Sequence, residues 1–285
     1  MTILRELVAE ELSLPVDSRV AAVAQAIAAK HEGASRAVLF YGSCLREREL
    51  EGLMLDFYLI VSDYRSAYGK RWLAFANRLI PPNVFYFEHD GLVAKYAVLS
   101  EGDFYRFNGP ETSSVSVWAR FAQPTRLVWA ADQEARKRVM DAVSRAAPTL
   151  LAAAGRRTGE KPLDWWRRAF TLTYSAELRA ERPGRNASVV DADRDRYVRF
   201  TGPAADAIER EPRASWRWRR IEGKALSMLR LAKATATFAG GPDYIAWKIN
   251  RHAGTEIALK PWQRRHPLLA AVSLLPRLLR SGAVR

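Results

Sequence analysis

The sequence predicts an α+β fold, in which a mixed sheet with flanking helices is followed by a mostly helical part. Two observations lead to this prediction. Short β-prone runs separated by turns are concentrated in the first 131 residues, whereas helical spacing of apolar residues dominates from residue 132 onward. We therefore expect a sheet domain over 1–131, a helical domain over 132–260 with a small winged-helix-like wing, and a basic amphipathic segment over 261–285.

Local signals define the elements of the first half. Asp17 and Ser18 are helix-capping residues, and the apolar spacing after them predicts a helix that ends near Gly33. The proline pair at 81–82 ends a second helix, and the residues at 89–91 favour a tight turn between two strands. The remaining expected elements are strands over 36–41, 53–61, 84–88 and 92–99, a helix over 64–79, and shorter elements over 118–121 and 126–129.

The second half is read as helical, with expected helices over 132–153, 163–181, 215–238 and 243–252 and one wing strand over 255–259. The alternating tryptophans and arginines at 216–220 leave two interpretations open. They are the residue types of a nucleic-acid stacking platform, but at this spacing they spread around a helix and equally suit a solvated or interfacial face.

Charge is divided unevenly along the 285 residues. The first 131 residues hold 14 basic and 15 acidic side chains, whereas the remainder holds 31 and 16. This basic half predicts an anionic partner, either nucleic acid or a phospholipid surface. Cys44 is the only cysteine, so the sequence excludes an internal disulfide and a thiolate metal cluster, and no apolar run approaches the ~20 residues of a membrane span.

The candidate site lies between the first two expected strands. Gly42 and Ser43 end the first strand in a turn, and Asp56 is a lone carboxylate within the second, otherwise apolar strand. Glycine lets a backbone approach a phosphate, and a carboxylate in such a strand is costly unless it binds something, for example a divalent cation. This pattern is typical of nucleotidyltransferases, although Tyr58 stands where most of them carry a second acid.

The last stretch, from Trp262, contains five arginines and no acid. Its apolar side chains fall on one helical face, which predicts a helix lying in an anionic bilayer interface or, alternatively, packing on the protein's own core. The residues expected to meet the membrane are Trp262, Arg264, Arg265, Leu268, Val272, Leu275, Arg277, Leu279 and Arg280.

Between residues 36 and 200 the chain resembles the mitochondrial-type phosphatidate cytidylyltransferases, also called the mitochondrial translocator assembly and maintenance family. The resemblance rests on the segments at 41–43, 54–57, 94–100, 119–124 and 173–179. It implies a nucleotidyltransferase domain with a single aspartate in the return strand, a helical second domain and a membrane-associating C-terminal helix. Cys44 and Glu177 depart from the family pattern, and the histidine-rich segment of the family is missing.

The resemblance, together with the motif, implies Mg²⁺-dependent transfer of CMP from CTP to phosphatidate or a related anionic lipid. In this hypothesis Asp56 holds Mg²⁺ and Lys95 neutralises phosphate. The remaining nucleotide-binding residues would be Tyr41, Gly42, Ser43, Tyr96, Glu177 and Arg179. The protein is then expected in the cytoplasm, at the inner face of the membrane. Two alternatives remain: an RNA-directed nucleotidyltransferase or nucleic-acid-binding protein, and a catalytically silent scaffold.

Overall fold

A five-stranded mixed sheet forms the centre of the protein, in a computed structural model that describes residues 2–46, 50, 52–177, 189–210, 212, 214–237 and 260–261. The strand order is β3-β4-β2-β1-β5, and all neighbours are antiparallel except β2 and β4, which are parallel. The strands are β1 (Ser35–Tyr41), β2 (Met54–Val61), β3 (Asn83–His89), β4 (Leu92–Ser100) and β5 (Thr125–Ala130). This confirms the predicted α+β class and its mixed sheet.

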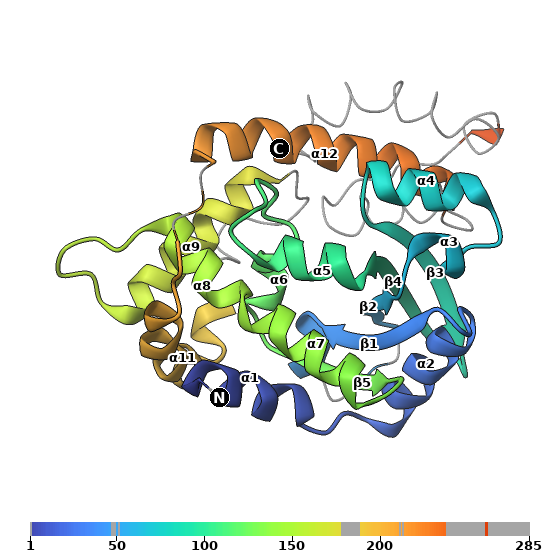
Figure 1. The fold of residues 1–285 in the computed structure, drawn as a ribbon, viewed down its shortest axis with the longest axis horizontal. Coiled ribbons are helices and arrows are strands. Elements are labelled where there is room, and N and C mark those ends of the chain that lie inside the picture. The colour runs from blue at the N-terminus through green and yellow to red at the C-terminus, as the bar shows by residue number, and fades with distance from the viewer. Residues whose placement is uncertain are drawn as a thin grey trace.

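Alternate residues of the strands enter two different cores, as expected for a sheet covered on both faces. One core lies under α2 (Ser18–Ala29), α3 (Tyr64–Ala67) and α4 (Arg71–Leu79) and contains Phe57 and Tyr96. The larger core lies on the opposite face. Its helices, seen grouped around the sheet in Figure 1, are α1 (Ile3–Ser13), α5 (Glu101–Asn108), α6 (Trp118–Phe121), α7 (Gln133–Ser144), α8 (Ala146–Ala154), α9 (Pro162–Ala176) and α11 (Arg194–Asp206).

A long helix, α12 (Trp216–Thr237), runs along one side of the molecule and packs on α9 and β3 (Figure 1). It confirms the helix predicted over 215–238. Its run of tryptophans and arginines divides between interior and solvent: Trp216 donates to Ala153 O at 2.9 Å and Arg219 is buried against Trp118, whereas Trp218 is exposed. The run is therefore partly structural.

Three predicted helices differ from the observed ones. The helix expected over 64–79 is two, because the backbone is extended at Tyr68 and places that ring in the core. The helix expected over 132–153 restarts at Ala146: Pro148 has no N–H to continue α7, but it fits the first turn of a new helix. The helix expected to reach residue 181 ends at Ala176, and Glu177 adopts an extended conformation.

The sequence-based prediction also missed three helices. In α1 the apolar residues Leu4, Val8 and Leu12 recur every fourth position and are buried, although acidic residues lie between them. In α5 the side chain of Ser100 caps the helix by accepting from Asp103 N at 3.2 Å. The third, α11, is capped in the same way by Asp193.

The larger core joins residues from both sides of residue 131. The domain limits at 131 and 260 stay predictions, and the helix over 243–252 and the wing strand lie outside the described residues. Among the helices that the structure describes, none combines the length and the apolar character needed to cross a membrane.

Candidate functional site

The predicted turn and carboxylate lie side by side at one end of the β1–β2 hairpin. Tyr41, the last residue of β1, pairs with Asp56 of β2. The chain then turns at Gly42, whose φ is +93°, and continues into a short 3₁₀ helix, η1 (Ser43–Arg46). A Cβ atom placed on Gly42 would lie 3.2 Å from Asp56 Oδ2. The carboxylate therefore faces the turn, and a side chain at position 42 would crowd it.

Lys95 is the cross-strand neighbour of Asp56. The parallel pairing of β2 with β4 places the two residues in register, and Lys95 Nζ lies 3.0 Å from Asp56 Oδ1. The same oxygen is buried and accepts no hydrogen bond of good geometry. A buried carboxylate oxygen that has an ion-pair partner but accepts no hydrogen bond can still coordinate a cation.

Two tyrosines and an arginine extend the site along the same face of the sheet. The rings of Tyr41 and Tyr58 lie 5.3 Å apart, and the half-buried Arg120 interacts with the Tyr41 hydroxyl. Burial, with Asp56 adding to it, raises the pKa of Tyr41 well above its usual range, so this tyrosine stays neutral. Burial opposes the charge of Arg120, but Glu177 and the neighbouring groups raise its pKa overall.

Glu177 lies between two arginines. Its Oε1 is 3.9 Å from Arg120 and 4.0 Å from Arg230 of α12, and the residue is buried. Glu177, expected at the nucleotide, is thus placed beside Arg120, whose charge Asp56 also stabilises. In this position it balances two positive charges that face the hairpin.

Arg230 and Lys233 bring α12 to the loop between α4 and β3. Arg230 Nε donates to Pro81 O at 2.8 Å, and Lys233 Nζ donates to Pro82 O at 2.9 Å and to Ile80 O. Burial, and then the nearby Arg230, lower the pKa of Lys233 to about 7. This lysine therefore changes charge near neutral pH, at the edge of the site.

The residues around Asp56 carry a net positive charge. Two carboxylates, those of Asp56 and Glu177, are set against the basic side chains of Lys95, Arg120 and Arg230, and Lys233 lies at the edge of the site. Within the described ranges, no three histidine, cysteine, aspartate or glutamate side chains gather to hold a metal. The arrangement suits an anion that brings its own cation, as a nucleoside triphosphate brings Mg²⁺.

The crowding at Gly42 is open to test. We expect Gly42→Ala to lower the free energy of unfolding by about 2 kcal/mol, because a methyl group there meets both backbone strain and the Asp56 carboxylate. The matched control is Gly33→Ala, where φ is +80° but no atom lies within 4 Å. Urea denaturation should show the larger loss for Gly42→Ala, and equal losses would argue against a carboxylate held at the turn.

Tyr96, expected at the nucleotide, lies on the other face of the sheet from Lys95. It is buried among aromatic residues, and its hydroxyl lies 3.0 Å from Nε2 of His31. His31 Nδ1 lies 2.9 Å from Ala67 O, so Nδ1 donates and Nε2 accepts from the tyrosine. The structure does not bring Tyr96 to the site, and Ser43 remains exposed next to Gly42.

The buried His31 gives a pH-dependent stability. Burial lowers the pKa of His31, so the folded state binds fewer protons than the unfolded state below about pH 6.5. Stability should therefore fall as the pH drops below about 6.5, which urea midpoints at each pH would measure. His31→Gln should flatten this slope, and an unchanged slope in that variant would show that His31 does not cause it.

The remaining site predictions fall outside the described residues. Arg179 is one of them, and so are all the membrane residues expected from Trp262 onward.

Conversely, the sequence-based prediction missed four site residues, which are Tyr58, Arg120, Arg230 and Lys233. Arg120 belongs to the 119–124 segment of the resemblance, and Tyr58 shares the parity of Asp56 on β2, so both carried a usable signal. Arg230 and Lys233 carried none, because only the fold brings α12 to the hairpin.

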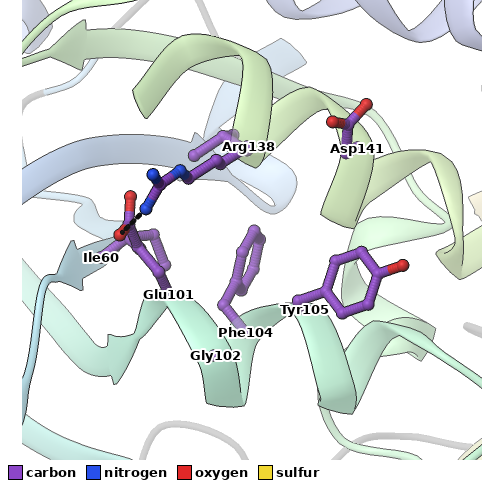
Figure 2. A pocket seen from close by; sticks show the side chains of 8 residues that line it. Ile60, Glu101, Gly102, Phe104, Tyr105, Arg138 and Asp141 are labelled. Carbon is purple, nitrogen blue, oxygen red and sulfur yellow. Dashed lines mark hydrogen bonds and ion pairs between the residues drawn. The ribbon is translucent and has the colours of Figure 1, made fainter. Parts of the chain in front are cut away.

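A pocket of about 310 Å³ lies away from this site, between α5 and α7 (Figure 2). Phe104 lines it, and the Glu101–Arg138 ion pair, 3.0 Å long, closes one side. Its strand residue, Ile60, is near the far end of β2 from Asp56. The pocket therefore belongs to the helical layer and not to the hairpin turn.

Comparisons with known proteins do not assign the chain to a family. No protein-family model matches the chain, and no curated protein matches it. The solved structures similar to it include a nucleotidyltransferase-like protein from Exiguobacterium sibiricum 255-15, with 10% sequence identity, a TM-score of 0.28 and 92% of each chain covered. A likeness at this level does not specify an activity, so the function is inferred from the site itself.

Proposed function

We propose that this protein is a nucleotidyltransferase, which moves a nucleotide from a nucleoside triphosphate to an acceptor. The observation that carries the proposal is the Asp56 carboxylate, which is held against the Gly42 turn and whose buried Oδ1 lies 3.0 Å from the Lys95 ammonium. This oxygen fits a Mg²⁺ ion, which Asp56 would hold and which would neutralise the triphosphate when bound. The net positive surroundings favour the same anionic ligand.

The protein's own residues then act mainly by positioning and by charge. The turn after Tyr41 presents backbone amides and the Ser43 hydroxyl to phosphate oxygens. Lys95 and Arg120 stabilise the negative charge that develops as the acceptor oxygen bonds to the α-phosphorus and pyrophosphate leaves. Glu177 orients Arg120 and Arg230 without contacting the substrate itself.

We propose CTP as the donor and phosphatidate, or a related anionic lipid phosphate, as the acceptor. The sequence resemblance at 41–43, 54–57 and 94–100 supports this choice, because these segments contain the Gly42 turn, Asp56 and Lys95. The phosphomonoester of such a lipid is an anion that suits Lys95 and Arg230. The protein would then work in the cytoplasm, at the inner face of the membrane.

An RNA acceptor is the competing candidate, but the placement of 216–220 disfavours it. Trp216 is partly buried with its indole N–H bonded to a backbone carbonyl, and Arg219 is buried. Neither side chain is free to stack on a base, so Trp218, which is exposed, is the one tryptophan of this run that could stack on single-stranded nucleic acid.

The test is incubation of the full chain with labelled CTP and Mg²⁺, with either phosphatidate vesicles or an RNA oligonucleotide as acceptor. We expect label in a charged liponucleotide extracted into organic solvent, and none on the RNA. Labelled RNA would show that the acceptor is RNA and not a lipid. Absence of both products, together with absence of Mg²⁺–CTP binding by calorimetry, would leave the scaffold interpretation.

A further inference from the structure

Helix α4 has its large apolar side chains on the outside. Its buried residues are Ala74 and Asn77, whereas Trp72, Phe75 and Leu79 are 48%, 69% and 65% exposed. At about 100° per residue these three side chains lie within about 60° of arc, so they form one stripe facing solvent. Such an arrangement is the reverse of a helix that packs on its own core, and it marks a surface that contacts something else.

The charges that α4 itself carries are all positive. Arg71 and Arg78 lie beside the stripe, Lys70 precedes the helix, and residues 70–79 contain no acid. Arg71 and Arg78 project from the same side of the helix as Phe75, as expected from the spacing. A tryptophan and basic side chains around an exposed apolar stripe are the features of a helix that lies in an anionic lipid interface.

The stripe ends at the site. Leu79 is followed by the loop at 80–82, whose carbonyl groups accept from Arg230 and Lys233 of α12. Arg230 in turn lies 4.0 Å from Glu177, within the charged cluster that includes Arg120. A surface that lies on α4 is thus adjacent to the basic edge of the candidate site.

The outer face of α12 is also apolar and basic, although it includes one acid, the half-buried Glu222. Its exposed large apolar residues are Trp218, Ile221, Met228 and Leu229, and the basic residues Arg217, Arg220 and Lys224 lie beside them. Figure 1 shows α4 beside the C-terminal part of α12, and Arg230 of α12 donates to Pro81 O just after α4. Two helices of this composition at one edge of the molecule favour an anionic bilayer over a compact protein partner, because both carry basic side chains beside their exposed apolar residues.

We propose that α4 docks on an anionic phospholipid bilayer, with Trp72, Phe75 and Leu79 inserted at the headgroup level and Arg71 and Arg78 on the lipid phosphates. Docking in this orientation presents the basic edge of the site, at Arg230 and Lys233, to lipid headgroups. The inference deepens the proposed function, on which it rests for the identity of the acceptor, by assigning the surface that delivers the lipid.

The direct test uses an environment-sensitive fluorophore on full-length protein. In a Cys44→Ala background, which removes the sole cysteine, Phe75→Cys and Leu79→Cys are labelled, and Lys137→Cys on the exposed side of α7 is the matched control. With vesicles of phosphatidylcholine and phosphatidylglycerol, the α4 labels should brighten and shift to the blue, and the α7 label should not. An unchanged α4 label on vesicle-bound protein would overturn the proposal, as would a shift produced by raising protein concentration without vesicles.

A second experiment removes the stripe. The triple variant Trp72→Ser, Phe75→Ser, Leu79→Ser should reduce vesicle partitioning at least about tenfold, and its thermal midpoint should stay close to that of the parent because these side chains are exposed. The control is Ile3→Ser, Leu14→Ser, Val198→Ser, which removes comparable exposed apolar residues elsewhere. Equal partitioning of the two variants would contradict docking through α4.

These results separate the docking surface from the activity. Vesicle docking through α4 without any liponucleotide product would support the docking surface and contradict the proposed transferase activity. Liponucleotide formation with an unchanged α4 label would support the activity and contradict the docking surface. The segment from Trp262 is present in every variant, so its own contribution to vesicle binding cancels in each comparison.

Discussion

Asp56→Asn should lower nucleotide transfer by about 10³-fold or more while leaving the fold intact. The amide keeps the size of the side chain beside Gly42 but removes the charge that would hold the cation and that now faces Lys95 at 3.0 Å. Because this ion pair is partly exposed, its loss should change the free energy of unfolding by less than about 1 kcal/mol. Steady-state turnover of labelled CTP and urea denaturation of the same preparation measure the two quantities.

The matched control for this variant is Asp103→Asn. Asp103 has a similarly low exposure, 18% against 22% for Asp56, and also pairs with a base, Arg106, at 2.6 Å. Asp103 accepts a hydrogen bond from the Tyr64 hydroxyl at the other end of the sheet. Asp103→Asn should therefore leave turnover unchanged. Full activity of Asp56→Asn would remove the metal assignment, and with it the proposed mechanism.

Glu11→Ala should destabilise the protein by about 3–5 kcal/mol, the largest effect on stability that we expect. Glu11 of α1 and Arg196 of α11 form a buried two-pronged ion pair, with the second contact 3.0 Å long and both side chains at most 10% exposed. Arg196 also donates to Ala122 O and packs over Phe200. Removing the carboxylate would leave a buried guanidinium without its counter-charge.

Two further variants test this explanation. On the same pair of helices, Glu10 and Arg199 form an exposed ion pair at 2.8 Å, so Glu10→Ala should cost less than about 1 kcal/mol. The double change Glu11→Leu with Arg196→Met should recover most of the lost stability, because no unpaired charge remains. A double variant as unstable as Glu11→Ala would show that packing, and not the stranded charge, dominates. Urea midpoints decide between these outcomes.

The sequence was most informative where local signals coincide with the site. The Gly42 turn, the lone Asp56 and the strands around them were all predictable, because turn chemistry and β-prone runs act over a few residues. The divided helices were also within reach, since Pro148 and Gly69 are both strong local signals. What no local pattern contained was the approach of Arg230 to the hairpin, which depends on how α12 packs across the molecule.

Strand parity explains the different outcomes for Lys95 and Tyr96. Consecutive residues of a strand point to opposite faces, so both could not face Asp56. The register of β4 against β2 places Lys95 with Asp56 and sends Tyr96 to His31 in the other core. The parity was visible in the sequence, but the choice between the two residues required the pairing of β4 with β2.

The parallel pairing of β2 with β4 has a consequence for the order of folding. Asp56 and Lys95 are neighbours in space but far apart along the chain, since α3, α4 and β3 lie between their strands. Closing such a long intervening segment is slow compared with forming the β1–β2 and β3–β4 hairpins, which are local. In a refolding experiment, affinity for a triphosphate should therefore return with the slowest structural phase, so that ligand binding reports completion of the sheet.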